Sequence, residues 1–199
     1  MRPGQGVRTE YLKAFAEIVG RVAMALSKSR PGSLPIRMVV AGGAALYLHT
    51  GVRVSEDIDA TFSHRLVLGE DIEVSYRDAD GQARLLYLDR NYNETLGLLH
   101  ENAHAQSVPV TIPGINEAVV EVRVLSPLDL AVTKISRFSE QDRADMELLA
   151  REGLIDAKSL RRRAEEALRG YVGDLQSAQT SIELACGIVD AAARPRRRR

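Results

Sequence analysis

Two acidic residues, Asp57 and Asp59, stand on either side of one isoleucine in a stretch that is typical of a β-strand. Because successive side chains of a strand point to opposite faces, both carboxylates are expected on one face, about 7 Å apart along the chain. Carboxylates of this kind bind Mg²⁺ together with waters and substrate phosphates. The pair therefore predicts a metal site, although an ordinary solvated strand end has the same composition.

A glycine pair, Gly42 and Gly43, follows the apolar run 36–40 and opens a short helical segment that Gly51 is expected to end. Glycines leave backbone amides open to close approach, and the amides at a helix N-terminus attract anions. The turn and the acids are separated by one short helix. They are therefore expected to converge on one nucleotide, with phosphates at the turn and metal ions at the acids.

The elements that position these residues are predicted as a helix, a sheet and a series of helices. An apolar stripe over 10–28 predicts the first helix, and alternating residues around Asp80-Gly81 predict a hairpin over 70–88. Two further strands are expected over 107–112 and 118–125. Four helix-start patterns follow, at Ser126, Ser139, Asp156 and Asp174. The expected fold class is α+β, with a mixed central sheet, flanking helices and a C-terminal helical bundle.

The predicted domain boundaries follow the change from strands to helices. Residues 1–125 are expected to form an α/β core with its N-terminal helix, and residues 126–193 a helical region. The first helix of that region is predicted to run from Pro127 to about residue 138. Residues 194–199 form an arginine-rich tail that is expected to be unstructured.

The bulk composition excludes several classes of protein. The 199 residues carry no net charge, so a strongly basic nucleic-acid-binding protein is not indicated. A single cysteine, Cys186, allows no internal disulfide and favours the reducing cytoplasm. No apolar run approaches the ~20 residues that span a bilayer, so no membrane partner is expected. Positive charge gathers over 158–169 and in the tail, as either a solvated face or an RNA-contacting arm.

The order of these residues resembles the DNA-polymerase-β-like nucleotidyltransferase superfamily. It is most similar to the small bacterial nucleotidyltransferases related to the abortive-infection (AbiEii-type) toxins. The first set of matching positions is Gly42, Gly43, Gly51, Arg53, Ser55, Asp57 and Asp59. The stretch 124–134, with Arg137, Asp142 and Asp145, is similar to the later motifs of that group. The resemblance extends over roughly residues 36–155.

The resemblance implies transfer of a nucleoside monophosphate from an NTP to an acceptor, with release of pyrophosphate. Two Mg²⁺ ions would be held by Asp57 and Asp59. The superfamily adds a third carboxylate from a later strand, which helps the acceptor hydroxyl to lose its proton. Asp89, at the end of an apolar strand, is preferred for this role. Glu121 is the alternative, although its position suits the wet face of a strand on which it pairs with Arg123.

Six residues are predicted to bind the nucleotide: Gly42, Gly43, Arg53, Ser55, Lys134 and Asp145. A lysine at position 134 suits contact with the triphosphate because its ammonium is a compact point charge. Asp145 is expected to orient Lys134 or the base, since helix capping by Ser139 already accounts for Asp142. Arg53 and Ser55 either hold phosphates or cap a turn.

The resemblance further implies a macromolecular acceptor, either RNA (tRNA) or protein, and a role in a toxin–antitoxin or phage-defence pair with a cognate antitoxin. One feature departs from the superfamily, whose more typical turn is Gly-Ser. Here Gly43 and Ala44 provide no hydroxyl. The alternative interpretation is a catalytically weak or inactive member that acts as a nucleotide sensor or as a protein- or RNA-binding partner.

Overall fold

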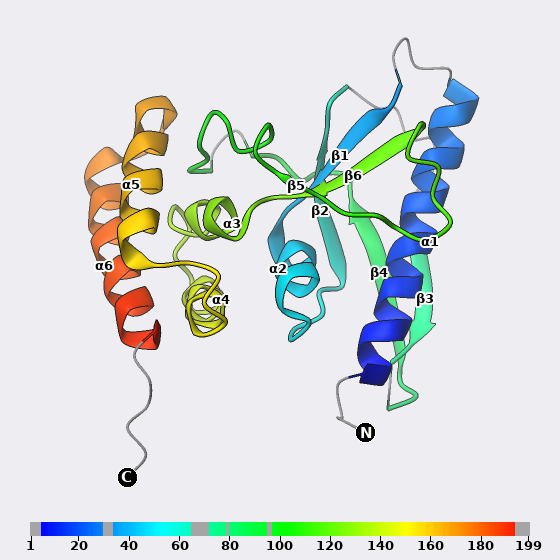
Figure 1. Ribbon diagram of the computed structural model, residues 1–199, viewed down its shortest axis with the longest axis horizontal. Helices are drawn as coiled ribbons and strands as arrows, with labels where there is room; N and C mark the ends of the chain where they lie inside the picture. The colour runs from blue at the N-terminus through cyan, green and yellow to red at the C-terminus, as the bar shows by residue number, and fades with distance from the viewer. Residues whose placement is uncertain (1–4, 30–33, 65–71, 79, 95–96, 194–199) are drawn as a thin grey trace. The chain divides into compact units, whose positions relative to one another are not determined.

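The computed structural model describes residues 5–29, 34–64, 72–78, 80–94 and 97–193 (Figure 1). The chain divides into two compact units. The first comprises Met1–Tyr92 and Val108–Val124, and the second comprises Asn93–Ser107 and Leu125–Arg199. The predicted α+β class is confirmed, with a six-stranded mixed sheet in the first unit and helices packed together in the second. The predicted tail, 194–199, lies outside the described residues.

The sheet of the first unit has the strand order β3-β4-β2-β1-β6-β5. Its strands are β1 (Ile36–Val40), β2 (Asp57–Phe62), β3 (Glu73–Arg77), β4 (Ala83–Asp89), β5 (Val108–Pro109) and β6 (Val120–Val124). The pairs β1–β6 and β2–β4 are parallel, and the other three neighbouring pairs are antiparallel. The edge strand β5 is shorter than the predicted 107–112, although the N–H of Val110 just beyond it still donates to the Val122 carbonyl of β6 at 3.0 Å.

Two helices pack against one face of this sheet. They are α1 (Gln5–Ser29), which runs alongside β3 and β4 in Figure 1, and α2 (Gly42–Thr50). The ring of Tyr11 in α1 lies 4.4 Å from that of Tyr47 in α2 and 6.2 Å from that of Tyr76 in β3. Alternate strand residues on this face are buried and apolar, among them Ile36, Met38, Val40, Ile58, Val74, Leu86, Leu88, Val120 and Val122. The polar strand residues therefore lie on the opposite face.

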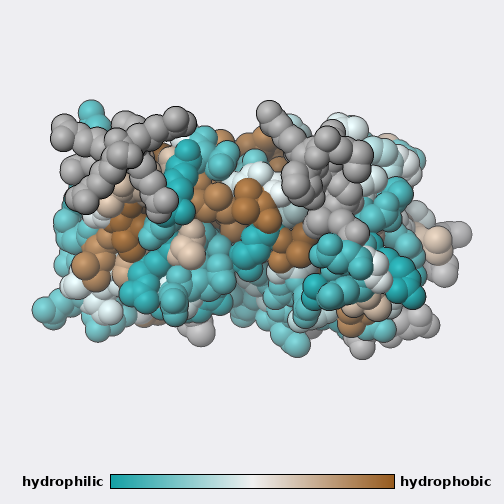
Figure 2. Space-filling model, turned by 90° about the horizontal axis from the view of Figure 1, so that it is seen from below, coloured by the Kyte–Doolittle hydropathy of each residue, from teal (hydrophilic) through white to brown (hydrophobic). Residues whose placement is uncertain are grey.

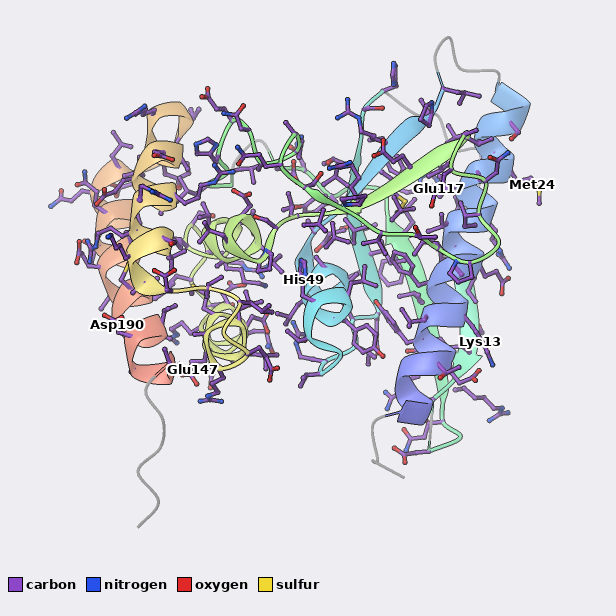
Figure 3. All side chains as sticks on the ribbon, viewed as in Figure 1. Lys13, Met24, His49, Glu117, Glu147 and Asp190 are labelled. Carbon is purple, nitrogen blue, oxygen red and sulfur yellow. The ribbon has the colours of Figure 1, made fainter. Side chains whose placement is uncertain are left out.

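The short helix α2 ends where the sequence predicts. Gly51 adopts the left-handed conformation at φ 69°, and its N–H donates to the Tyr47 carbonyl at 2.7 Å. Only glycine takes this conformation without a steric cost, so Gly51 terminates the helix and turns the chain toward β2. His49 lies in the last turn of the same helix (Figure 3).

The second unit contains α3 (Pro127–Thr133), α4 (Glu140–Arg151), α5 (Ala157–Ala167), a 3₁₀ turn (Leu168–Gly170) and α6 (Leu175–Ala193). The predicted helix starts are confirmed by side-chain caps: the oxygens of Ser126, Ser139, Asp156 and Asp174 accept backbone N–H groups of the following turns. Each cap satisfies an amide that has no partner within its own helix.

The first helix of this unit is shorter than predicted. α3 ends at Thr133 instead of about residue 138, and Lys134 is its C-cap. Phe138 then takes a positive φ of 47°, which ends any helical path before α4. The C-cap residue Lys134 forms an ion pair with Asp145 of α4 at 2.7 Å, a contact between residues of different helices. Propensity within the segment carries no information about that ion pair.

On the face shown in Figure 2, apolar residues are exposed between hydrophilic ones. Exposed large apolar side chains include Leu85 and Tyr87 of β4. None of the described helices combines the length and the apolar character needed to cross a membrane.

Candidate active site

The acid pair opens strand β2. Asp57 and Asp59 are both half-buried, and Ile58 between them is fully buried against the helices. Both carboxylates therefore lie on the face of the sheet opposite α1 and α2, about 7 Å apart along the strand. This face, which carries Asp57, Asp59 and also Asp89, is called the acidic face below.

Asp89 lies directly beside Asp59. The parallel register of β2 and β4 pairs Asp59 with Asp89 and Asp57 with Tyr87. Register partners on neighbouring strands point to the same face, at a strand spacing of about 4.8 Å. One oxygen of Asp89, Oδ1, accepts the backbone N–H of Asn91 at 2.8 Å, which fixes the orientation of the carboxylate. The sheet thus brings three of the predicted acids together.

The alternative third acid, Glu121, lies elsewhere on the sheet. It is on β6, which is separated from β2 by β1, and its register partner on β1 is Arg37. Arg37 lies beside the C-terminal end of β2, whereas Asp59 is near the N-terminal end of that strand. Two strand spacings and the rise along the strand therefore separate Glu121 from Asp59 by roughly 15 Å. Its carboxylate accepts a hydrogen bond from Arg123 at 2.6 Å. The strand-face pairing predicted for Glu121 and Arg123 is present.

The glycine turn is packed against the acid strand. Gly42 has a φ of 57°, and a Cβ at this position would collide with the carboxylate of Asp59. The N–H of Ala41 donates to the Asp59 carbonyl at 2.8 Å, which joins the turn to β2. Ala41, the N-cap residue of α2, supplies no side-chain cap to the helix. The first amides of α2 therefore begin immediately beside Asp59.

The loop between α2 and β2 brings a hydroxyl to the same turn. A Cβ on Gly43 would lie 2.7 Å from Ser55 Oγ and 3.6 Å from a guanidinium nitrogen of Arg53. The hydroxyl of Ser55 also donates to the Asp57 carboxylate. A hydroxyl is thus present at Gly43, although it comes from Ser55 and not from the residue after the glycine. Sequence reasoning missed this because the two residues meet only in the fold.

One family model, described as "Nucleotidyltransferase of unknown function (DUF6036)", matches residues 19–181. The chain belongs to this nucleotidyltransferase family. The matched range includes every candidate site residue, and membership implies an NTP as substrate. Searches of curated proteins and of solved structures gave no match.

The acidic face of this nucleotidyltransferase suits Mg²⁺ better than a metal that is enclosed by protein ligands. Among the described residues, no group of three His, Cys, Asp or Glu side chains converges closely enough to hold a metal ion. Mg²⁺ needs no such group, because it binds one or two carboxylates and completes its octahedron with waters and phosphate oxygens. Asp57 and Asp59 provide carboxylates on one face beside the first amides of α2, so the donor set fits.

Tyr87 is a member of the acidic face that sequence reasoning did not single out. It is 40% exposed, although it belongs to a strand whose neighbouring residues Leu86 and Leu88 are buried. The negative charge of Asp57 is the largest cause that raises the pKa of its phenol, followed by partial desolvation and by Asp89. The phenol is therefore neutral at physiological pH. The sequence did contain an indication of this: Tyr87 is two residues before Asp89, and alternate residues of a strand share a face.

The second unit of the nucleotidyltransferase holds the two later candidates as an ion pair. Lys134 Nζ donates to Asp145 Oδ2 at 2.7 Å and lies 3.6 Å from Asp142 Oδ1. All three side chains are buried, with exposed fractions of 6%, 2% and 0%. Gln141 donates to the other oxygen of Asp145 at 2.9 Å. Asp145 therefore orients the ammonium of Lys134.

Asp142 is a capping residue, as its sequence context predicts. It forms a capping box with Ser139 and accepts two hydrogen bonds from Arg137, at 2.7 and 2.8 Å. Burial by itself would raise the pKa of Asp142, but the hydrogen bonds from Arg137 and Ser139 and the charge of Lys134 hold it well below its usual value. The carboxylate thus stays ionised inside the unit.

Two arginines of the basic stretch 158–169 have partners within the second unit. Arg163 binds the buried carboxylate of Asp129 through two hydrogen bonds, at 2.7 and 3.0 Å. Arg161 binds Glu183 of α6 with two nitrogens. These two ion pairs stabilise helix packing, and they also neutralise part of the positive charge of this stretch.

Proposed function

We propose that this nucleotidyltransferase transfers a nucleoside monophosphate from an NTP to a hydroxyl group of a macromolecular acceptor, either tRNA or a protein. The supporting observation is the pairing of Asp59 with Asp89 in the sheet, with Asp57 on the same face. Three carboxylates beside the start of a helix are the groups that metal-assisted phosphoryl transfer needs. Positioning and electrostatics supply most of the catalysis in such reactions.

The triphosphate would be bound at the first turn of α2. Neither Gly42 nor Gly43 has a side chain of its own that could cover its amide, and the helix N-terminus favours negative charge. Arg53 and Ser55 lie beside Gly43, where a guanidinium and a hydroxyl suit phosphate oxygens. The four residues would hold the phosphates against the acid strand.

Asp57 and Asp59 would hold the Mg²⁺ ions, which neutralise charge on the phosphates when bound. Asp89 would accept the proton of the acceptor hydroxyl as its oxygen bonds to the α-phosphorus. The bond from that phosphorus to the bridging oxygen breaks, and pyrophosphate leaves. Asn91 orients Asp89 for this step through its hydrogen bond to Oδ1.

Lys134 would contribute positive charge toward the triphosphate, and Asp145 would act as a positioning residue for it. The support for this role is the similarity of the stretch 124–134 to the later motifs of the superfamily; within the second unit, Asp145 holds the ammonium of Lys134 in one orientation. Loss of Asp145 would then affect NTP binding through Lys134. The ion pair also stabilises the second unit, so any variant needs a stability measurement beside the kinetic one.

The test is transfer of label from α-labelled NTPs in the presence of Mg²⁺, with total RNA or cell lysate as acceptor. The wild-type protein is expected to transfer label, and Asp57→Ala and Asp59→Ala are expected to abolish transfer. Glu121→Gln is the matched control, because it neutralises a carboxylate of the same sheet outside the acidic site. Tight NTP binding without transfer to any acceptor would instead favour a nucleotide sensor.

The biological role that we propose is that of a toxin in a toxin–antitoxin or phage-defence pair, acting in the cytoplasm on tRNA or protein. The support is the similarity of the motif series to the AbiEii-type toxins. Induced expression of the wild-type protein should arrest bacterial growth, whereas Asp57→Ala at equal protein level should not. Equal growth of the two strains would contradict this role without affecting the enzymatic proposal.

A further inference from the structure

A pocket borders Asp89 at the end of β4. Its volume is about 470 Å³, and it is lined by Ile72, Glu73 and the segment 87–91. Sites for small molecules have volumes of several hundred Å³, so a nucleoside fits in this space. The pocket therefore opens at the carboxylate to which the proposed function assigns the acceptor proton.

The ring of Tyr87 is placed among carboxylates on this side of the sheet. Its register partners are Asp57 on β2 and Glu73 on β3, and Asp89 follows two residues later on the same face. Burial would stabilise a large aromatic side chain, yet 40% of this one is exposed. A neutral ring that is left exposed beside a pocket offers a flat surface for stacking.

We propose that this pocket binds the terminal nucleoside of an RNA acceptor, with the base stacked on Tyr87 and the ribose hydroxyl directed at Asp89. The proposal rests on the proposed function and specifies its acceptor. Base stacking on an aromatic side chain tolerates every base, because each has a π-face. Arg90 also lines the pocket, and its guanidinium would contact the preceding phosphate.

The observations favour RNA over a protein acceptor. A serine or threonine hydroxyl would need only Asp89 and a path to it, whereas an exposed ring and a guanidinium match a base and a phosphate. In the reaction, the ribose hydroxyl loses its proton to Asp89 and its oxygen bonds to the α-phosphorus. The bond between that phosphorus and the bridging oxygen breaks, and pyrophosphate carries away the electron pair.

The experiment measures label transfer from α-labelled NTP, with Mg²⁺ and full-length protein, as a function of total RNA concentration. Tyr87→Thr keeps strand propensity but removes the ring, so the apparent KM for RNA should rise about tenfold or more. The Kd for NTP, measured by calorimetry, should stay at the wild-type value. Tyr87→Phe keeps the ring and should restore the KM. Leu85→Thr is the control, since Leu85 is equally exposed on the same strand outside the pocket.

Several results would overturn the inference while leaving the enzymatic proposal intact. They are an unchanged KM in Tyr87→Thr, label that enters protein instead of RNA, and transfer to RNA whose terminal diol has been destroyed by periodate. In all three cases transfer would still depend on Asp57. If Asp57→Ala transfers label as well as the wild type, the proposed function itself fails.

A second variant keeps the test decisive if Tyr87→Thr does not fold. Arg90→Gln lies at an exposed position after the strand and should raise the KM for RNA. It should also reduce the dependence of that KM on salt, because one phosphate contact is lost. A KM and a salt dependence equal to those of the wild type would count against the pocket as the acceptor site.

Discussion

Asp59 on β2 and Asp89 on β4 are direct register partners in two parallel strands. They are thirty positions apart in the chain, yet the pairing places their carboxylates side by side on one face of the sheet. Glu121 is on the same sheet, but β1 lies between its strand and β2. The strand order therefore separates the two candidates for the third acid.

We expect Asp89→Asn to lower label transfer about 100-fold or more, because the general base is lost. Binding of NTP with Mg²⁺ should change little, since Asp57 and Asp59 remain. Glu121→Gln should transfer label at close to the wild-type rate. Single-turnover rates at saturating NTP distinguish the two variants, and the opposite ranking would assign the role to Glu121.

Gly42→Ala should impair both stability and NTP binding. The positive φ of Gly42 is strained for alanine, and the added Cβ collides with Asp59. Forcing such a conformation costs about 1–3 kcal/mol, to which the collision adds. Gly114→Ala is the matched control, because Gly114 has a φ of 82° with nothing within 4 Å. Urea unfolding and NTP titration of both variants separate backbone strain from the collision; equal effects would argue against the packing on Asp59.

Lys134→Met should destabilise the protein by about 3–5 kcal/mol, because it leaves the buried carboxylate of Asp145 without its cation. Arg151→Met is the comparison, since Arg151 pairs with Glu147 on the exposed surface of α4. That change should cost about 0.5 kcal/mol or less. Urea unfolding followed by circular dichroism gives both values. A loss for Lys134→Met as small as that for Arg151→Met would show that the ion pair is dispensable.

The low pKa of Asp142 predicts the direction of a pH effect on stability. Its pKa in the folded state lies below that in the unfolded chain, so the unfolded chain binds the proton more readily. The stabilisation is fully present above the unfolded value, near 3.8, and is lost as the pH falls toward the folded value. The stability difference between the wild type and Asp142→Asn should therefore be constant near neutral pH and shrink below about pH 4. Urea midpoints from pH 3 to pH 7 measure this difference, and a difference that grows on acidification would contradict the prediction.

Local features of the fold could be predicted from the sequence because the responsible atoms are close in the chain. Ser126, Ser139 and Asp156 cap helices through amides three residues away, and Gly51 ends α2 through its own backbone conformation. The face shared by Asp57 and Asp59 follows from strand geometry in the same way. Such features need no knowledge of distant residues.

Features that depend on distant partners could not be predicted in the same way. The sequence gives no register between β2 and β4, so the choice between Asp89 and Glu121 stayed open. α3 ends early, at Thr133, and its C-cap residue Lys134 binds Asp145 of another helix, a partner that the segment itself does not reveal. Likewise, the absence of a hydroxyl after Gly43 suggested a weakened turn, whereas Ser55 reaches that turn from the next loop.

The packing of Gly42 against Asp59 has a mechanical consequence. The carboxylate rests on the main chain of the turn, and the Ala41 amide binds the backbone of the same aspartate at 2.8 Å. No side chain separates the turn from the acid strand, so the two are in direct contact. A shift of the turn on binding an anion would therefore be transmitted directly to this carboxylate.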